Sequence, residues 1–120
     1  MLSAYAQLDP ITIPIGTSVS RVVKGVYEYH DAVGLMFYSP NTLPESVYFE
    51  INQDENAMAG SSGWVALQTY ASGALANVVL PAVGTAQVYQ EVVFSGCLRL
   101  RSTTNVAADR TFTANKIWTT

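Results

Sequence analysis

Residues 95–118 read SGCLRLRSTTNVAADRTFTANKIW, and this stretch decides the fold class. It contains an alternating segment at 97–101, a polar segment, and a second alternating segment that ends at 118. In the first segment, Leu98 and Leu100 fall on one side, and the other side carries Cys97, Arg99 and Arg101. A period of two residues is typical of a strand with one face on a core. We therefore expect two closing strands, with the arginines of the first on its outer face.

The preceding chain shows the same pattern in short segments that are separated by turn residues. Further strands are expected at 11–16, 17–29 with a break at Gly25, 32–38, 46–52, 64–70 and 77–80. The side chains expected to point inward include Val33, Leu35, Phe37, Val47, Phe49 and Ile51. A helix is considered only at 82–92, where Gly84 and the β-branched residues favour one turn or an extended connection. This spacing predicts an all-β, single-domain antiparallel β-sandwich, jelly-roll-like, of about eight strands.

The chain of 120 residues is expected to form one domain, preceded by an N-terminal arm. Residues 1–9 are the arm, in which Tyr5 and Leu8 are the candidate anchors, and residues 10–120 are the sandwich. Pro14 removes a backbone donor from the 11–16 segment, so we expect an edge strand there. Alternatively, the arm and this strand, with Ile13, pair with a neighbouring subunit.

Charged residues make up only 12% of the chain, whereas about 25% is usual for soluble domains. A surface so poor in charge is weakly protected against association. Two interpretations fit: a small neutral β-protein, or a subunit packed against copies of itself or a larger assembly. The net charge of −3, without a basic run, argues against nucleic-acid binding.

Neither a membrane span nor a secretory signal is expected from the distribution of apolar residues. The apolar runs are shorter than the ~20 residues of a membrane span. The first ten residues contain no basic segment followed by an apolar one.

The residues that could carry chemistry form no catalytic pattern. His30 and Asp31, with Glu28 nearby, could supply a general base, but a turn between strands is the favoured interpretation. Residues 52–56 loosely match a calcium loop, but Ala57 and Gly63 stand where glycine and glutamate are required. A single histidine excludes a multi-histidine metal site within one chain. We expect no enzyme activity, no metal and no cofactor.

Three arginines are the most informative polar residues: Arg99, Arg101 and Arg110. They either pair with Glu50 or Glu91 on a solvated face, or bind carboxylates across a subunit contact through their planar guanidinium groups. Asp109 and Arg110 are expected to fix the start of the last strand by local pairing.

Other exposed side chains leave further alternatives open. Cys97 shares a strand face with two of these arginines, which would activate its thiol, but a partly buried and inert thiol is the default. Trp64, Tyr48 and Tyr70 either stack on sugar rings or cover interfaces and sandwich ends.

Several segments together resemble small β-sandwich proteins encoded among the structural genes of tailed bacteriophages. They are GWVAL at 63–67, the strand that ends at Pro81, Tyr89, FSGCLRLRS at 94–102 and AADRTF at 107–112. The similar proteins include capsid decoration (cement) proteins and domains of tail proteins. The pattern, over residues 30–118, is also similar to the galactose-binding-like jelly-roll architecture.

The resemblance implies a non-enzymatic virion protein that binds the outer capsid surface and stabilises the shell. It implies a homotrimer that binds the major capsid protein and is made in the host cytoplasm. The interface residues expected from the sequence are Tyr5, Leu8, Ile13, Arg99, Arg101 and Arg110. The alternative is a carbohydrate-binding or adhesion module of a phage tail or fibre, with Trp64, Tyr48 and Tyr70 as the glycan platform.

Overall fold

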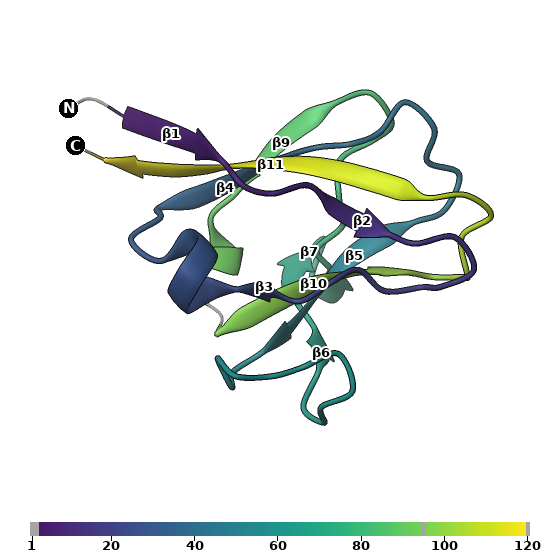
Figure 1. Cartoon of the computed structure of the whole chain (residues 1–120), viewed down its shortest axis with the longest axis horizontal. Helices are drawn as coiled ribbons and strands as arrows, with labels where there is room; N and C mark the ends of the chain where they lie inside the picture. The colour runs from purple at the N-terminus through teal and green to yellow at the C-terminus, as the bar shows by residue number, and fades with distance from the viewer. Residues whose placement is uncertain (1–2, 95, 120) are drawn as a thin grey trace.

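Two antiparallel sheets pack face to face in the computed structural model, which describes residues 3–94 and 96–119 (Figure 1). The first sheet lies above and the second below in this view, with their strands running roughly across it. The prediction of an all-β, antiparallel, sandwich-like domain is confirmed.

The first sheet is organised around one long strand, β11 (Arg110–Thr119). Its strands have the order β1-β11-β4-β9, and β2 pairs with the part of β11 that β1 leaves open. The bounds of the other strands are Ser3–Gln7 for β1, Ile11–Ile13 for β2, Gly34–Tyr38 for β4 and Ala86–Tyr89 for β9.

The second sheet has the strand order β3-β10-β5-β6. Its strands are β3 (Val23–Lys24), β10 (Cys97–Ser102), β5 (Val47–Asn52) and β6 (Val65–Ala66). A separate two-stranded hairpin follows β6 in the chain and consists of β7 (Gln68–Ala71) and β8 (Ala74–Asn77).

An aromatic cluster joins the two sheets at the centre of the core. Phe49 from the second sheet lies 5.1 Å from Phe37 and 4.8 Å from Tyr89, measured between ring centres, and both partners come from the first sheet. All three pairs of rings meet edge to face, the geometry that aromatic quadrupoles favour. The Tyr89 hydroxyl donates a hydrogen bond to the carbonyl of Val79, and burial raises its pKa.

Two short helical segments differ from the predicted strands and turns. Residues 17–29 were expected to be strand with a break at Gly25, but Gly25–Tyr29 forms a π-helix. A single turn or an extended connection was expected at 82–92, and Glu91–Phe94 forms a 3₁₀-helix. A Cβ atom on Gly25 would lie 2.8 Å from the carbonyl oxygen of Gly96, so this close approach requires glycine. Leu35 and Phe37 point inward as expected, whereas Val33 precedes β4 and is 45% exposed.

The N-terminal segment is part of the chain's own first sheet. Residues 3–7 pair with β11 as β1, and the amide of Leu8 donates to the carbonyl of Ala114. Leu8 is half-buried against the core, and Ile13 is fully buried. Ile13 is therefore a core residue and offers no surface to a neighbour. Residues 1 and 2 of the expected arm lie outside the described residues.

Replacing the central ring tests this account of the core. Phe49→Ala is expected to lower the free energy of unfolding by about 4 kcal/mol, because it removes buried area and leaves a cavity between the sheets. Urea denaturation measures the change. The control Val83→Ala, at a side chain that is 49% exposed, should cost less than about 0.5 kcal/mol. Equal effects of the two substitutions would contradict the assignment.

Candidate functional site

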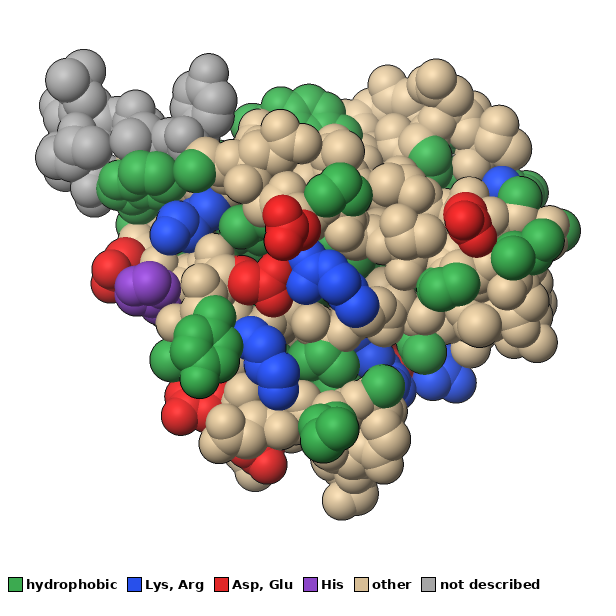
Figure 2. All heavy atoms as spheres, in the orientation of Figure 1, with side chains coloured by type: hydrophobic (Ala, Val, Ile, Leu, Met, Phe, Trp, Pro, Cys, Tyr) green, Lys and Arg blue, Asp and Glu red, His purple; other side chains and the backbone are tan. Residues whose placement is uncertain are grey.

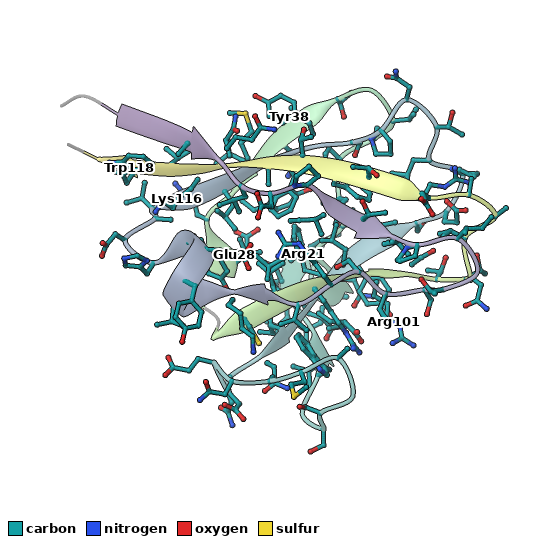
Figure 3. The ribbon with its side chains drawn as sticks, in the orientation of Figure 1. Arg21, Glu28, Tyr38, Arg101, Lys116 and Trp118 are labelled. Atoms are coloured by element: carbon teal, nitrogen blue, oxygen red, sulfur yellow. The ribbon has the colours of Figure 1, made fainter. Side chains whose placement is uncertain are left out.

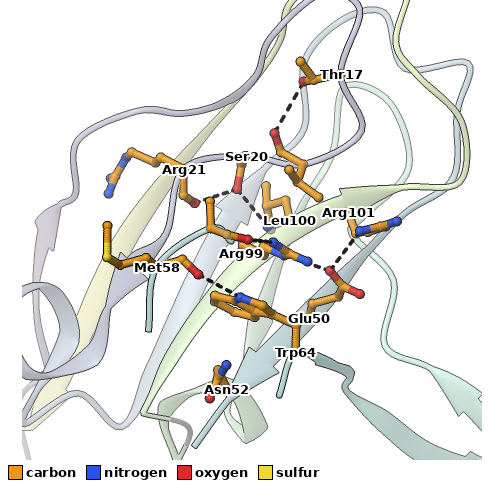
Figure 4. A network of polar contacts seen from close by, with 12 residues as sticks. Thr17, Ser20, Arg21, Glu50, Asn52, Met58, Trp64, Arg99, Leu100 and Arg101 are labelled. Carbon is orange, nitrogen blue, oxygen red and sulfur yellow. Dashed lines mark hydrogen bonds and ion pairs between the residues drawn. The ribbon is translucent and has the colours of Figure 1, made fainter. Parts of the chain in front are cut away.

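Arg99 is buried between the outer side of the second sheet and the loop of residues 53–64; we call the space that its side chain fills the Arg99 compartment. Its side chain is 8% exposed. Nε donates to Glu50 Oε1 over 2.8 Å, and Nη1 donates to the carbonyl of Ala59 over 2.9 Å (Figure 4). The guanidinium carbon lies 4.4 Å from the ring centre of Trp64, within the range of a cation–π contact. The expectation that Arg99 faces solvent is therefore wrong.

The sheet register and one buried asparagine build this compartment. Arg99 of β10 stands directly opposite Glu50 of β5, so the two side chains share a face. Asn52 then holds both ends of the covering loop. Its Oδ1 accepts from the amide of Asp54 over 3.0 Å, and its Nδ2 donates to the carbonyl of Ser62 over 3.0 Å.

Cys97 lies under the start of the same loop and is fully buried. Its Sγ is 3.4 Å from the carbonyl oxygen of Asp54, and burial raises the pKa of the thiol. Both observations favour the inert thiol over the activated one. The loop crosses β10 so closely that a Cβ atom on Gly96 would lie 2.6 Å from the carbonyl oxygen of Gln53.

Arg101 occupies the open part of this sheet face. Its side chain is 38% exposed and its Nη1 lies 3.6 Å from Glu50 Oε1. Tyr48, half-buried, is its partner across the strands. Pairing with Glu50 within the chain, one of the two interpretations, holds for Arg101 as it does for Arg99. A role of Arg101 in a subunit contact stays a prediction.

Arg110 forms a second buried ion pair, with Glu45. Nε lies 3.0 Å from Oε2 and Nη2 lies 3.1 Å from Oε1, with side chains 8% and 9% exposed. The hydrogen bond from Arg110 holds the pKa of Glu45 below its ordinary value. Local pairing with Asp109 was wrong: Asp109 Oδ1 instead accepts from the amide of Ile15 over 2.7 Å. Arg110 thus serves the fold and is not free on the surface.

The three aromatic candidates for glycan stacking lie on different elements. Trp64 ends the loop, with Arg99 over its ring and its Nε1 donating to the carbonyl of Met58 over 3.0 Å. Tyr48 is on β5, and Tyr70 is on β7 and 76% exposed. Of the expected interface residues, Tyr5 lies on β1 opposite Ile117, and its side chain is outside the described part of the chain.

His30 meets one carboxylate in an exposed turn. Its Nε2 lies 3.4 Å from Asp31 Oδ2, and the two side chains are 59% and 85% exposed. Glu28 points elsewhere: it accepts from the amide of Lys24 over 2.8 Å and pairs with Arg21 over 2.8 Å. Within residues 3–94 and 96–119, no group of three or more His, Cys, Asp or Glu side chains could hold a metal ion.

The outer face of the first sheet is a surface that sequence reasoning did not single out. The strand registers place uncharged side chains on it throughout; we call this the uncharged face, and its members are Gln7, Thr12, Met36, Tyr38, Ala86, Val88, Thr111, Thr113, Asn115 and Ile117. Figure 3 shows Tyr38 on the side of this sheet away from Arg21 and Glu28. Figure 2 shows hydrophobic and other uncharged side chains along the upper edge of the view, whereas the Lys, Arg, Asp and Glu side chains are spread over its middle, lower part and sides.

A second uncharged region was also missed, although the sequence contained its signal. Residues 56–90 contain no Asp, Glu, Lys, Arg or His. They include the β7–β8 hairpin, in which every residue is exposed. The turn expected at 71–74, between the strands expected at 64–70 and 77–80, is present: Ser72 and Gly73, both with positive φ, form a two-residue hairpin connection.

The chain matches no protein-family model and no curated protein. Of the helices in the described part of the chain, none has the length and apolar character needed to cross a membrane.

The two arginines of β10 should differ sharply in their effect on stability. Arg99→Met is expected to lower the free energy of unfolding by about 3 kcal/mol, because it leaves Glu50 buried without its nearest cation. Arg101→Met, at a partly exposed guanidinium 3.6 Å from the same carboxylate, should cost less than about 1 kcal/mol. Replacing both Arg99 and Glu50 by apolar residues should recover much of the loss. Denaturant titration at neutral pH measures all three variants, and equal losses for the two arginines would refute the arrangement.

The Glu45–Arg110 pair should make the free energy of unfolding depend on pH in the acidic range. Because the folded pKa of Glu45 is lowered, the pair stabilises the fold above the ordinary value of 4.5 and loses this effect as the pH falls further. Glu45→Gln should cost roughly 2 kcal/mol at pH 7, and this difference from the parent should shrink below about pH 4.5. The control Glu55→Gln, at an exposed loop position, should differ from the parent by less than about 0.5 kcal/mol. A constant difference for Glu45→Gln from pH 7 to pH 3 would contradict the assignment.

Proposed function

We propose that this chain is a non-enzymatic structural subunit that binds the outside of a larger protein shell, as a phage capsid decoration protein does. The observation that supports the proposal is the uncharged face of the first sheet. Its Thr, Asn, Gln, Tyr, Met, Val and Ile side chains can be covered by a partner without removing any charge from water. The resemblance to phage virion proteins supplies the kind of partner, the major capsid protein.

The properties of this face suit a docking surface. The side chains around Tyr38 and Val88 combine apolar area with hydroxyl and amide groups, the mixture found in protein interfaces. Thr12 and Thr111 already hydrogen-bond to each other across β2 and β11 over 2.9 Å, which holds part of the surface in one geometry before binding. Order of this kind lowers the entropic cost of association.

The carbohydrate-binding alternative receives less support from the geometry. Trp64 has Arg99 over its ring and a hydrogen bond on its indole nitrogen, so it is not a free stacking platform. Tyr48 and Tyr70 lie on a sheet strand and on the hairpin. In the proposal that we favour, the chain is a virion component that is made in the host cytoplasm and forms homotrimers. It stabilises the capsid through many copies of one weak contact.

Capsids prepared without this protein provide the test. The purified chain should bind them to a fixed number of copies per particle and raise their temperature of disruption. Val88→Lys places a charge on the uncharged face and should weaken binding at least tenfold, because the ammonium group must be desolvated. Thr103→Lys, in the exposed loop after β10, is the matched control and should bind like the parent.

Two results would overturn the proposal. One is binding of the chain to a glycan array with no binding to capsids. The other is equal capsid binding by Val88→Lys and the parent, which would remove the uncharged face as the docking surface.

A further inference from the structure

The β7–β8 hairpin projects from the second sheet without packing on the core. All four residues of each strand are exposed, and among the described residues the two strands pair only with each other. Both sides of its base bond to the backbone of Phe49: the amide of Leu67 donates to the carbonyl of Phe49 over 2.9 Å, and the amide of Phe49 donates to the carbonyl of Val78 over 3.1 Å. In Figure 1 the hairpin lies behind β5.

Such a hairpin is unusual on a protein surface. A two-stranded hairpin alone is marginally stable in water. Natural edge strands are commonly protected by charged residues, proline or a bulge, because open edges pair with other chains. Residues 68–77 contain neither a charged residue nor proline, and the ladder is continuous over its four residue pairs. Tyr70 and Leu75, opposite each other, are nevertheless 76% and 56% exposed.

The pairing of the strands gives the hairpin two different faces. Side chains alternate along a strand, and directly opposed residues share a face. One face therefore carries large side chains, from Gln68, Tyr70, Leu75 and Asn77, and the other carries small ones, from Thr69, Ala71, Ala74 and Ala76.

The backbone also leaves outward-pointing donors. The amide of Val78 donates to the carbonyl of Leu67 over 2.8 Å, which marks this place in the ladder as the position of a hydrogen-bonded pair, although the amide of Leu67 donates to Phe49 instead. Since such pairs alternate in an antiparallel ladder, Tyr70 and Leu75 are a non-hydrogen-bonded pair, and their N–H and C=O groups point away from the hairpin. Each edge thus offers a donor and an acceptor to a further strand.

We infer that the hairpin is the self-association element of this protein, and that its occupant is the same hairpin of a second copy. The edges of β7 and β8 each supply what the other requires, an unpaired donor and acceptor beside uncharged side chains. When β8 of one copy pairs with β7 of the next, the pairing is antiparallel and brings their Tyr70 and Leu75 side chains together on one face of the joined sheet. A partner with a charged surface would instead lose the solvation of its charges here. This inference deepens the proposed function, because it names the surface through which the subunits join.

The test is the mass of the full-length chain in solution as a function of concentration, measured by sedimentation or by light scattering after gel filtration. The parent is expected to form a defined oligomer. Leu75→Pro removes an outward donor without breaking the hairpin's own ladder, and Leu75→Lys places a charge at the contact. Each should raise the dissociation constant roughly 30-fold or more, the effect of losing a central interface residue. The control Val83→Lys, at an exposed valine outside the hairpin, should associate like the parent.

Hydrogen exchange provides a second readout at single amides. The Tyr70 and Leu75 amides of the parent should exchange slowly at high concentration and quickly after dilution, while the Leu75→Lys variant should show fast exchange at Tyr70 at both concentrations. A parent that stays monomeric up to about millimolar concentration, or variants with the parent's association, would overturn the inference.

The outcomes separate this inference from the proposed function. A hairpin-dependent oligomer that fails to bind capsids supports the inference and refutes the proposed function. A monomer that binds capsids does the reverse.

Discussion

Strand β10 is buried on both faces from Cys97 to Leu100, and the second sheet depends on how the outer face of this strand is covered. The inner face packs two leucines against the core, as in any sandwich. The outer face carries Arg99, whose charge is costly to remove from water unless a carboxylate and other acceptors replace the solvent. Glu50, the carbonyl of Ala59 and the ring of Trp64 replace it. The loop that supplies two of these groups is therefore a layer of the fold.

The burial of charge also shapes the rest of the surface. Arg99 and Arg110 are two of only six basic residues, and both are buried beside glutamates. A chain with few charges has thus placed several of them inside, and this leaves the outer face of the first sheet and the whole of residues 56–90 neutral. The two ion pairs fix loops and strand ends at the expense of surface charge.

Local alternation predicted much of the fold but little of the candidate sites. Val47, Phe49 and the leucines of β10 face the core because period-two patterns report directly which side of a strand is buried. The π-helix of residues 25–29 was predicted as strand, because its β-branched and aromatic composition is typical of strands. The helix begins at Gly25, whose amide donates to the carbonyl of Gly96, a contact far away in sequence. The cover over Arg99 and the exposure of the hairpin are likewise tertiary properties, which no local pattern records.

The position of Cys97 makes its thiol a probe of local opening of the structure. It is the single cysteine of the chain, it has no exposed surface, and its sulfur lies under the first residues of the 53–64 loop. A thiol-specific reagent can therefore reach it only when that loop lifts from β10 or the whole chain unfolds. The rate of thiol modification consequently reports the opening of the 53–64 loop, whereas unfolding followed by spectroscopy reports the loss of both sheets. Any gap between the two free energies is the extra stability of the sandwich beneath its cover.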